Sequence, residues 1–283
     1  MSGQGGAQGS DVRLAVRVTS TAVHVAGLAP NGATIATSAL TLRHHRPAPD
    51  QVETSPEEVW QGTLSAVAEV GAALPEGWAV VEVAVGGDPH TLLVWDRETL
   101  GAPRPAITAG DRRTTGLCEQ LRAEGAAAHV ELLADQPLDH RVAGPRLRWL
   151  AEHEPHTWAL VEDGRYAVGG VESYLVARMT RGLEHVTDAA HARPTLLLGA
   201  EGWSEELCAL FGVPLDALPE LVEATSPAHA PTPRTDARPD ARTDARTDAR
   251  PDLRPDLRVG AWGRTDPRTF AGLAVPVSAL APA

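Results

Sequence analysis

The sequence contains no lysine, because all 25 of its basic residues are arginine. This absence excludes chemistry that needs an ammonium group, including Schiff-base catalysis and the phosphate-binding lysines of Walker-type NTPases and protein kinases. The 37 acidic residues outnumber the arginines and give a formal net charge of −12. That charge repels nucleic acid and anionic lipid over most of the surface, so we expect neither as a partner.

Cysteines and long apolar runs are also scarce. The two cysteines, Cys118 and Cys208, are too few for a disulfide framework or a thiolate metal cage. We therefore expect no metal site of that kind and a reduced, cytoplasmic setting. No run of about 18 apolar residues occurs, and residues 1–10 lack the basic and apolar regions of a signal peptide. The sequence thus predicts neither secretion nor a membrane span.

The 283 residues suffice for one large or two modest domains, and their pattern predicts an α/β architecture. Apolar alternation near the N-terminus predicts a three-stranded antiparallel meander. A Ser or Thr cap, a proline and two glutamates then predict the start of a helix. Three adjacent strands followed by alternating helices and strands indicate a mixed sheet flanked by helices. The predicted strands are 12–18, 22–28, 33–41, 78–85, 92–95, 194–198 and 274–281, and the helices begin at 54–58 or span 111–124, 143–154, 171–180 and 204–210.

Some local signals predict details of this architecture. The strands at 78–85 and 92–95 are apolar enough to be buried on both faces. Gly86-Gly87-Asp88 fits either a phosphate cradle or a tight strand exit, and the strand exit is the commoner arrangement. Asp111 is predicted to cap a helix whose first turn carries solvated arginines, Arg112 and Arg113.

A four-residue unit of the form Arg-Thr/Pro-Asp-Ala/Leu repeats from Arg234 to Arg258. Its period is too short for a solenoid and its apolar content too low for a core. Each arginine has an aspartate two residues away, which argues against an anion-binding arm. We therefore predict a disordered leader at 1–10, a folded lobe at 11–225, a disordered repeat loop at 226–258, and a return segment with a closing strand at 259–283.

Six stretches of the chain carry a pattern of known type: SPEEVWQ at 55–61, VWDRET at 94–99, DRRTTGLCEQL at 111–121, LRWL at 147–150, HVTD at 185–188, and LFGVP with LPE at 210–220. In this order and spacing they resemble the N-terminal lobe of the FGGY carbohydrate kinases, most closely the glycerol kinases. The resemblance covers residues 12–223 and implies an actin-like, ribonuclease-H-type α/β lobe. It also implies MgATP and a sugar or polyol in a cleft between two lobes, with an aspartate that accepts the substrate hydroxyl proton.

The chain departs from the family pattern where the phosphate-binding turn should lie. The family has Asp-x-Gly-Thr-Thr-Ser, and residues 15–20 match it. Ala15 replaces the aspartate that helps to hold the metal, and Arg17 replaces the glycine of the turn. Thr19 and Ser20 survive as a remnant of the phosphate loop.

The positions that bind polyol and carry out catalysis in the family are replaced as well. Pro89 and His90 stand where glycerol kinases have an Arg-Glu pair, and they cannot supply its bidentate fork and carboxylate. Ala109 stands for a stacking tryptophan and Arg141 for a tyrosine. Ala283 stands for the catalytic aspartate and is the last residue given, so we expect no catalytic residue, no polyol-binding residue and no second lobe in this chain.

The resemblance therefore predicts a glycerol-kinase-like protein by ancestry, with MgATP as the family cofactor, that is inactive as a single chain. Removal of a general base alone typically lowers a rate by about 10²–10⁴-fold. Three alternatives stay open. Another chain supplies the second lobe of a split kinase, or the lobe is an interaction or regulatory module that binds a protein through its cleft face, or the gene product has decayed and has no selected role.

Overall fold

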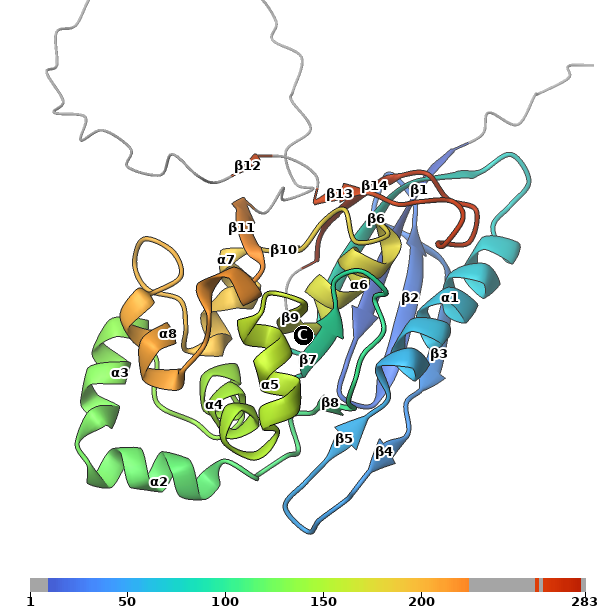
Figure 1. Ribbon diagram of the computed structural model, residues 1–283. Helices are drawn as coiled ribbons and strands as arrows, with labels where there is room; N and C mark the ends of the chain where they lie inside the picture. Colours follow the sequence, from blue (N-terminus) through green and yellow to red (C-terminus); the bar gives the residue numbers. More distant parts are fainter. Residues whose placement is uncertain (1–9, 224–257, 260–261, 281–283) are drawn as a thin grey trace, which may run out of the picture.

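The computed structural model describes residues 10–223, 258–259 and 262–280. Its main sheet has six strands in the order β13-β14-β6-β1-β2-β3, at the upper right of Figure 1. β1 runs antiparallel to β2 and parallel to β6, and β14 also runs parallel to β6. The predicted meander and the mixed sheet are therefore confirmed. The strands are β1 (Asp11–Val18), β2 (Ala22–Leu28), β3 (Thr34–Thr41), β6 (Ala79–Gly87), β13 (Gly263–Arg264) and β14 (Pro276–Ala279).

Two further sheets lie beside the main one. A five-stranded sheet has the order β4-β5-β8-β7-β9, and β10, β11 and β12 form a three-stranded sheet. β7 pairs with β9 along its whole length and is buried throughout, as predicted. The bounds are β4 (His44–His45), β5 (Glu53–Thr54), β7 (Leu92–Asp96), β8 (Ala106–Ile107), β9 (Tyr166–Gly170), β10 (Val186–Thr187), β11 (Glu220–Glu223) and β12 (Arg258–Val259).

Helix α1 (Pro56–Ala72) begins at the signals that the sequence predicted. The Ser55 hydroxyl accepts a hydrogen bond from the backbone nitrogen of Glu58, and Pro56 occupies the first turn. The apolar stripe of the helix packs over β2 and β3 (Figure 1). The other helices are α2 (Thr115–Ala123), α3 (Ala126–Ala134), α4 (Ala143–His153), α5 (Pro155–Glu162), α6 (Val171–Met179), α7 (Ala189–Ala192) and α8 (Glu205–Phe211), with 3-10 turns at Arg193–Thr195 and Leu215–Ala217.

The described residues have two apolar cores. In β1 every second residue, from Val12 to Val18, is buried on the face that packs with α1 and α6. The second core lies between the β7–β9 pair and helices α2, α4, α5 and α8. Cys118 and Cys208 are buried in this second core, in helices α2 and α8, and both are free thiols. Full burial of one aliphatic side chain contributes about 1.5–3 kcal/mol, so the two cores hold the site segments firmly.

Some local predictions were wrong. Residues 194–198 do not form a strand: Leu196 has a φ of 59°, and the chain makes a 3-10 turn followed by a bridge between Leu198 and Trp203. The run of leucines is apolar because it packs into the second core, whatever its backbone conformation. The first half of β6 is not buried on both faces, since Val81 is 41% exposed.

Other predictions concern residues that the structure does not describe. They include the leader apart from Ser10, residues 226–257 of the repeat loop, and Ala283. Within the described ranges, no helix combines the length and the apolar character that a bilayer crossing needs.

Candidate functional site

Three parallel strands of the main sheet, β1, β6 and β14, end at one edge. The backbone nitrogen of Asp88, just after β6, donates to the carbonyl of Val18 at the end of β1. The nitrogen of Leu280, just after β14, donates to the carbonyl of Val85. The turn with Thr19 and the turn with Pro89 therefore lie at the same edge of the sheet.

Thr19 and Ser20, which were predicted as a remnant of a phosphate loop, lie in an ordinary hairpin turn. The Thr19 hydroxyl donates to the carbonyl of Ala22 and accepts from its backbone nitrogen, both at 3.1 Å. Ser20 follows in the turn that joins β1 to β2 and is half-buried. The Thr19 hydroxyl is thus occupied by its own turn.

Ala15 and Arg17 point to the face of β1 opposite the core. Together with His24 and Leu280 they line a groove of about 500 Å³ on this face of the main sheet. None of the described residues that line the groove is acidic, and Arg17 adds a guanidinium where the family has glycine. A magnesium nucleotide needs carboxylate oxygens for its metal. The residues present at this end of β1 therefore do not fit the MgATP that the resemblance implies.

The turn that carries Pro89 and His90 is closed by Asp88. The Asp88 carboxylate accepts hydrogen bonds from the backbone nitrogen of His90 at 3.1 Å and from the Thr91 hydroxyl at 2.9 Å. Burial lowers the pKa of the half-buried His90 below its ordinary value. The Asp88 carboxylate raises this pKa, but the guanidinium groups of Arg141 and Arg146 lower it further. The His90 imidazole is therefore neutral near pH 7.

Ala109 and Arg141 lie on the two neighbouring segments. Ala109 follows β8, next to Thr108, whose hydroxyl donates to the carbonyl of Val52. Arg141 forms a bidentate ion pair with Asp139 at 2.9–3.0 Å and is half-exposed. Its hydrogen bonds hold the pKa of the Asp139 carboxyl well below its usual range.

Arg146 of α4 joins these segments. Its guanidinium is fully buried and donates to the carbonyls of His90, of Thr108 at 2.9 Å and of Asp111 at 3.3 Å. The His140 carbonyl, next to Arg141, accepts from the hydroxyl of Thr114 at 2.8 Å. The structure thus brings the segments of Pro89, His90, Ala109 and Arg141 together around one arginine.

Asp111 and Arg113 are buried, which corrects the prediction of a solvated helix start. The Asp111 carboxylate accepts from the backbone nitrogen of Val52 and from Arg113, and Arg113 also pairs with Glu53 at 2.7 Å. Helix α2 therefore begins only at Thr115, because residues 111–114 serve this network. Arg112 is exposed, as predicted.

Close packing accounts for the glycine at position 87. A Cβ atom at Gly87 would overlap the Cγ1 atom of Val171 and lie 3.4 Å from the backbone nitrogen of Glu172, both at the start of α6. Gly86 and Gly87 are the last two residues of β6, and the strand ends directly before Asp88.

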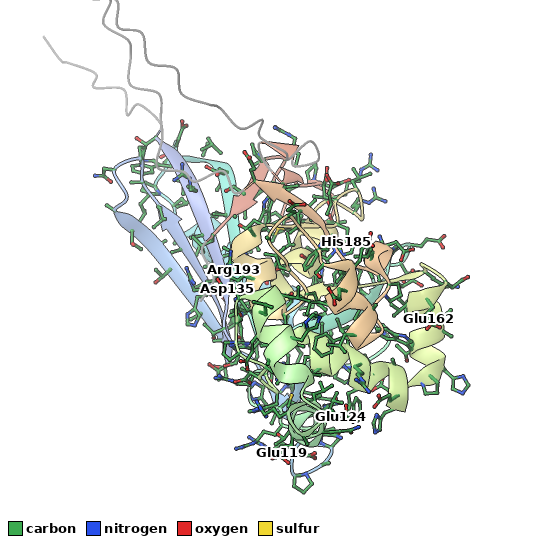
Figure 2. All side chains as sticks on the ribbon, turned by 90° about the vertical axis from the view of Figure 1, so that its left-hand side faces the viewer. Glu119, Glu124, Asp135, Glu162, His185 and Arg193 are labelled. Carbon is green, nitrogen blue, oxygen red and sulfur yellow. The ribbon has the colours of Figure 1, made fainter. Side chains whose placement is uncertain are left out.

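A second polar cluster, which was not predicted from the sequence, lies beside this one. Asp188 accepts from the backbone nitrogen of His191 at 2.9 Å and pairs with its Nδ1 at 2.8 Å. Burial lowers the pKa of His191, but the hydrogen bond to Asp188 and the carboxylate of Glu172 outweigh it and raise the value. Glu172, which is 3% exposed, accepts from the hydroxyls of Ser173 and Thr187. His185 and Arg193, which are close in sequence to Asp188 and His191, are labelled in Figure 2.

The described residues contain no group of three or more His, Cys, Asp or Glu side chains arranged to hold a metal ion. In the cluster of Glu172, Asp188 and His191, the carboxylates accept hydrogen bonds from hydroxyls, from a backbone nitrogen and from the His191 ring.

Among known proteins, kinases are similar to this chain in sequence. The chain is 36% identical to the glycerol kinase of Methylobacterium nodulans over 190 residues, which are 64% of this chain and 37% of that enzyme. It is 32% identical to the glycerol kinase of Paraburkholderia phytofirmans over 207 residues, 72% of this chain and 41% of that enzyme. The matched part therefore spans well under half the length of these relatives.

Solved structures show the same fold. The Plasmodium falciparum glycerol kinase with ADP has a TM-score of 0.80 at 17% identity, covering 97% of this chain and 49% of that chain. The xylulose kinase from Rhodospirillum rubrum has a TM-score of 0.73 at 20% identity, covering 95% and 48%. These likenesses confirm the actin-like α/β fold. Residues 14–239 match the model of the N-terminal domain of the FGGY family of carbohydrate kinases. The chain belongs to the FGGY family of carbohydrate kinases.

Proposed function

We propose that this chain is a glycerol-kinase-like lobe that does not catalyse phosphoryl transfer on its own. The observation that carries the proposal is the turn after β6. There Pro89 and His90 occupy the place of the Arg-Glu pair, and the adjacent carboxylate of Asp88 is bonded to His90 and Thr91. The turn supplies neither a bidentate fork nor a free carboxylate for a polyol.

The end of β1 supports the same proposal. Catalysis of phosphoryl transfer depends on positioning and on neutralising charge around the metal and the phosphates. Ala15 offers no carboxylate to a metal, and Arg17 fills the position that a tight phosphate turn leaves open. Loss of a single catalytic group typically lowers the rate by about 10²–10⁴-fold, so two losses at one edge remove useful activity.

A coupled assay for ADP release tests the proposal. Purified chain is mixed with MgATP and with glycerol, xylulose or gluconate, the last two because kinases for them share the fold. Active kinases turn over at about 1–100 s⁻¹, and we expect a rate at least 10³-fold lower, at the level of the blank. A rate that depends on glycerol and disappears when magnesium is chelated would overturn the proposal. Thermal unfolding with MgATP and with glycerol is the second readout, and we expect neither to raise Tm.

A protein-binding role is the second candidate, and the groove over Ala15, Arg17 and His24 favours it. The groove has a volume of about 500 Å³ and lies on the open face of the main sheet. Small side chains and one guanidinium group are among the groups that line it. A partner here would act either as the second lobe of a split kinase or as a regulated protein. Ala26→Glu changes the groove, and Ala72→Glu, at the exposed end of α1, is the matched control. A stoichiometric complex that only Ala26→Glu disrupts supports this role, and restored glycerol-dependent ADP release in that complex identifies a split kinase.

A further inference from the structure

A partly open cavity of about 30 Å³ lies behind the turn of His90, between α4, α7 and the paired strands β7 and β9. Aliphatic side chains from β7, β9 and α4 form part of its wall. Further apolar side chains, among them Leu197 and Leu218, also line it, and its polar residues include His90, Arg146, Glu172, Thr187 and His191. The cavity therefore has an apolar wall on one part of its surface. Its charged groups belong to both of the polar clusters described above.

Three of these side chains each keep one buried nitrogen without a hydrogen-bond partner among the described residues. They are Nδ1 of His90, Nε of Arg146 and Nε2 of His191. Arg146 is fully buried and His191 is 4% exposed. A buried polar atom left unpaired destabilises the folded protein, and one cavity lined by three such groups can recover that loss by holding a ligand. Nε of Arg146 can only donate, so the ligand must accept.

The charges around the cavity also restrict the ligand. Arg146 donates its other hydrogen bonds to backbone carbonyls, and the ion pairs among the described residues do not include it. A buried cation without an ion pair favours an anion. Glu172 stands in the same lining, and its carboxylate accepts hydroxyls from Ser173 and Thr187. A carboxylate can only accept, so an anion beside it must carry a hydrogen-bond donor of its own.

The size of the cavity limits the ligand further. A volume of about 30 Å³ holds roughly two to three water-sized groups, so the ligand has at most about three oxygen atoms. We propose that this cavity binds a small planar oxyanion with one hydroxyl group, of the bicarbonate class. Its anionic oxygens accept from Arg146 and the two histidines, and its hydroxyl donates to Glu172. The proposal concerns an interior site and does not depend on whether the lobe transfers phosphate.

Nitrate provides the discriminating probe, because it is planar and has four heavy atoms like bicarbonate but no hydroxyl. Purified full-length chain in degassed buffer is titrated with sodium bicarbonate, nitrate, formate or chloride at constant ionic strength, and thermal unfolding and calorimetry are recorded. We expect a saturable rise in Tm with bicarbonate and at least tenfold weaker binding of nitrate. Equal effects of all four anions, or no saturable effect of bicarbonate, would show that the cavity holds water only and overturn the proposal.

Two variants test the assignment of the residues. Glu172→Gln replaces an acceptor by an amide that can also donate, so nitrate should bind better, bicarbonate worse, and the preference should fall below about twofold. An unchanged preference in a folded Glu172→Gln protein contradicts the role of Glu172. If that variant does not fold, Ala143→Val decides: Ala143 lines the cavity at the start of α4, and an added volume there should abolish bicarbonate binding while every polar group stays in place. Bicarbonate binding that survives Ala143→Val places the anion elsewhere and refutes the site.

Discussion

The buried guanidinium of Arg146 donates a 2.9 Å hydrogen bond from Nη2 to the carbonyl oxygen of Thr108, and the same group reaches the carbonyls of His90 and Asp111. One side chain of α4 thereby fixes two backbone segments that are far apart in sequence. Burial lowers the pKa of Arg146 to about 10, which still leaves it charged near pH 7. The arrangement of the whole site edge depends on this residue.

Replacement of Arg146 should therefore destabilise the protein in graded fashion. Arg146→Gln leaves buried carbonyls without donors and should lower the free energy of unfolding by about 3 kcal/mol. Arg146→Lys keeps the charge but not the planar fork, so its loss should be smaller. Urea unfolding at neutral pH measures both values.

Arg148, two residues away, provides the matched control for Arg146. Its side chain is 28% exposed, and it pairs with Glu152 one helical turn along. Arg148→Gln should change the free energy of unfolding by less than about 0.5 kcal/mol. If Arg146→Gln and Arg148→Gln give equal losses, the joining role of Arg146 is wrong.

The ion pairs around Glu53 make a second prediction. Glu53 is buried and bonds to Arg104 at 2.8 Å and to Arg113 at 2.7 Å. Glu53→Gln removes the carboxylate that the two buried guanidinium groups share. Arg113 keeps Asp111 and Arg104 keeps Glu154, so the loss should be about 1.5–3 kcal/mol in urea unfolding. Glu58→Gln, whose partner Arg43 is exposed, should cost less than about 1 kcal/mol. Similar values for the two variants would contradict this account.

The contrast between Arg112 and Arg113 shows how far one sequence predicts this site. Adjacent, chemically identical residues end in opposite environments, because only Arg113 meets Asp111 and Glu53. Glu53 lies 60 residues earlier in the chain, and such a contact leaves no local pattern. On α4, Arg146 is fully buried, whereas the side chain of Arg148, two residues away, is 28% exposed. The resemblance indicated which segments of the chain would meet at the site. It did not indicate the buried side-chain bonds that connect them.

The secondary structure was more predictable where one force dominated. The alternation in β1 and the cap at Ser55 both act locally, and both elements lie where they were predicted. The leucines at 196–198 are buried for reasons of tertiary packing, so their apolar run was mistaken for a strand. Pro155 is the first residue of α5, since a proline that ends one helix also suits the first turn of the next.

We expect the protein to lose stability at acid pH because of His185, which is labelled in Figure 2. Burial lowers its pKa to about 3, and the nearby Arg97 adds to the shift. The unfolded chain takes up this proton near pH 6.5 and the folded protein does not, so stability is present above about pH 6.5 and falls as the pH drops toward about 3. Within that window the loss approaches about 1.4 kcal/mol per pH unit. His185→Phe keeps an aromatic ring beside Trp95 and should flatten the fall, as measured by urea unfolding across this range.

The exposed His45 controls for the loss of any one histidine. His45→Phe should leave the steepness of the acid-induced fall as it is in the wild type. An equal flattening in both variants, or none in His185→Phe, would show that other groups govern the acid response.

Gly87 offers the sharpest test of packing against phosphate binding. Gly87→Ala places a Cβ atom into the Cγ1 atom of Val171 and should lower the free energy of unfolding by about 1–3 kcal/mol. Val171→Ala removes the clashing atom and is itself destabilising, because Val171 is fully buried. The two losses should not add: Gly87→Ala should cost little in the Val171→Ala background, since the overlap is gone. Additive losses in this double-mutant cycle would mean that Gly87 is required for another reason, and the assignment of the turn as a simple strand exit would have to be given up.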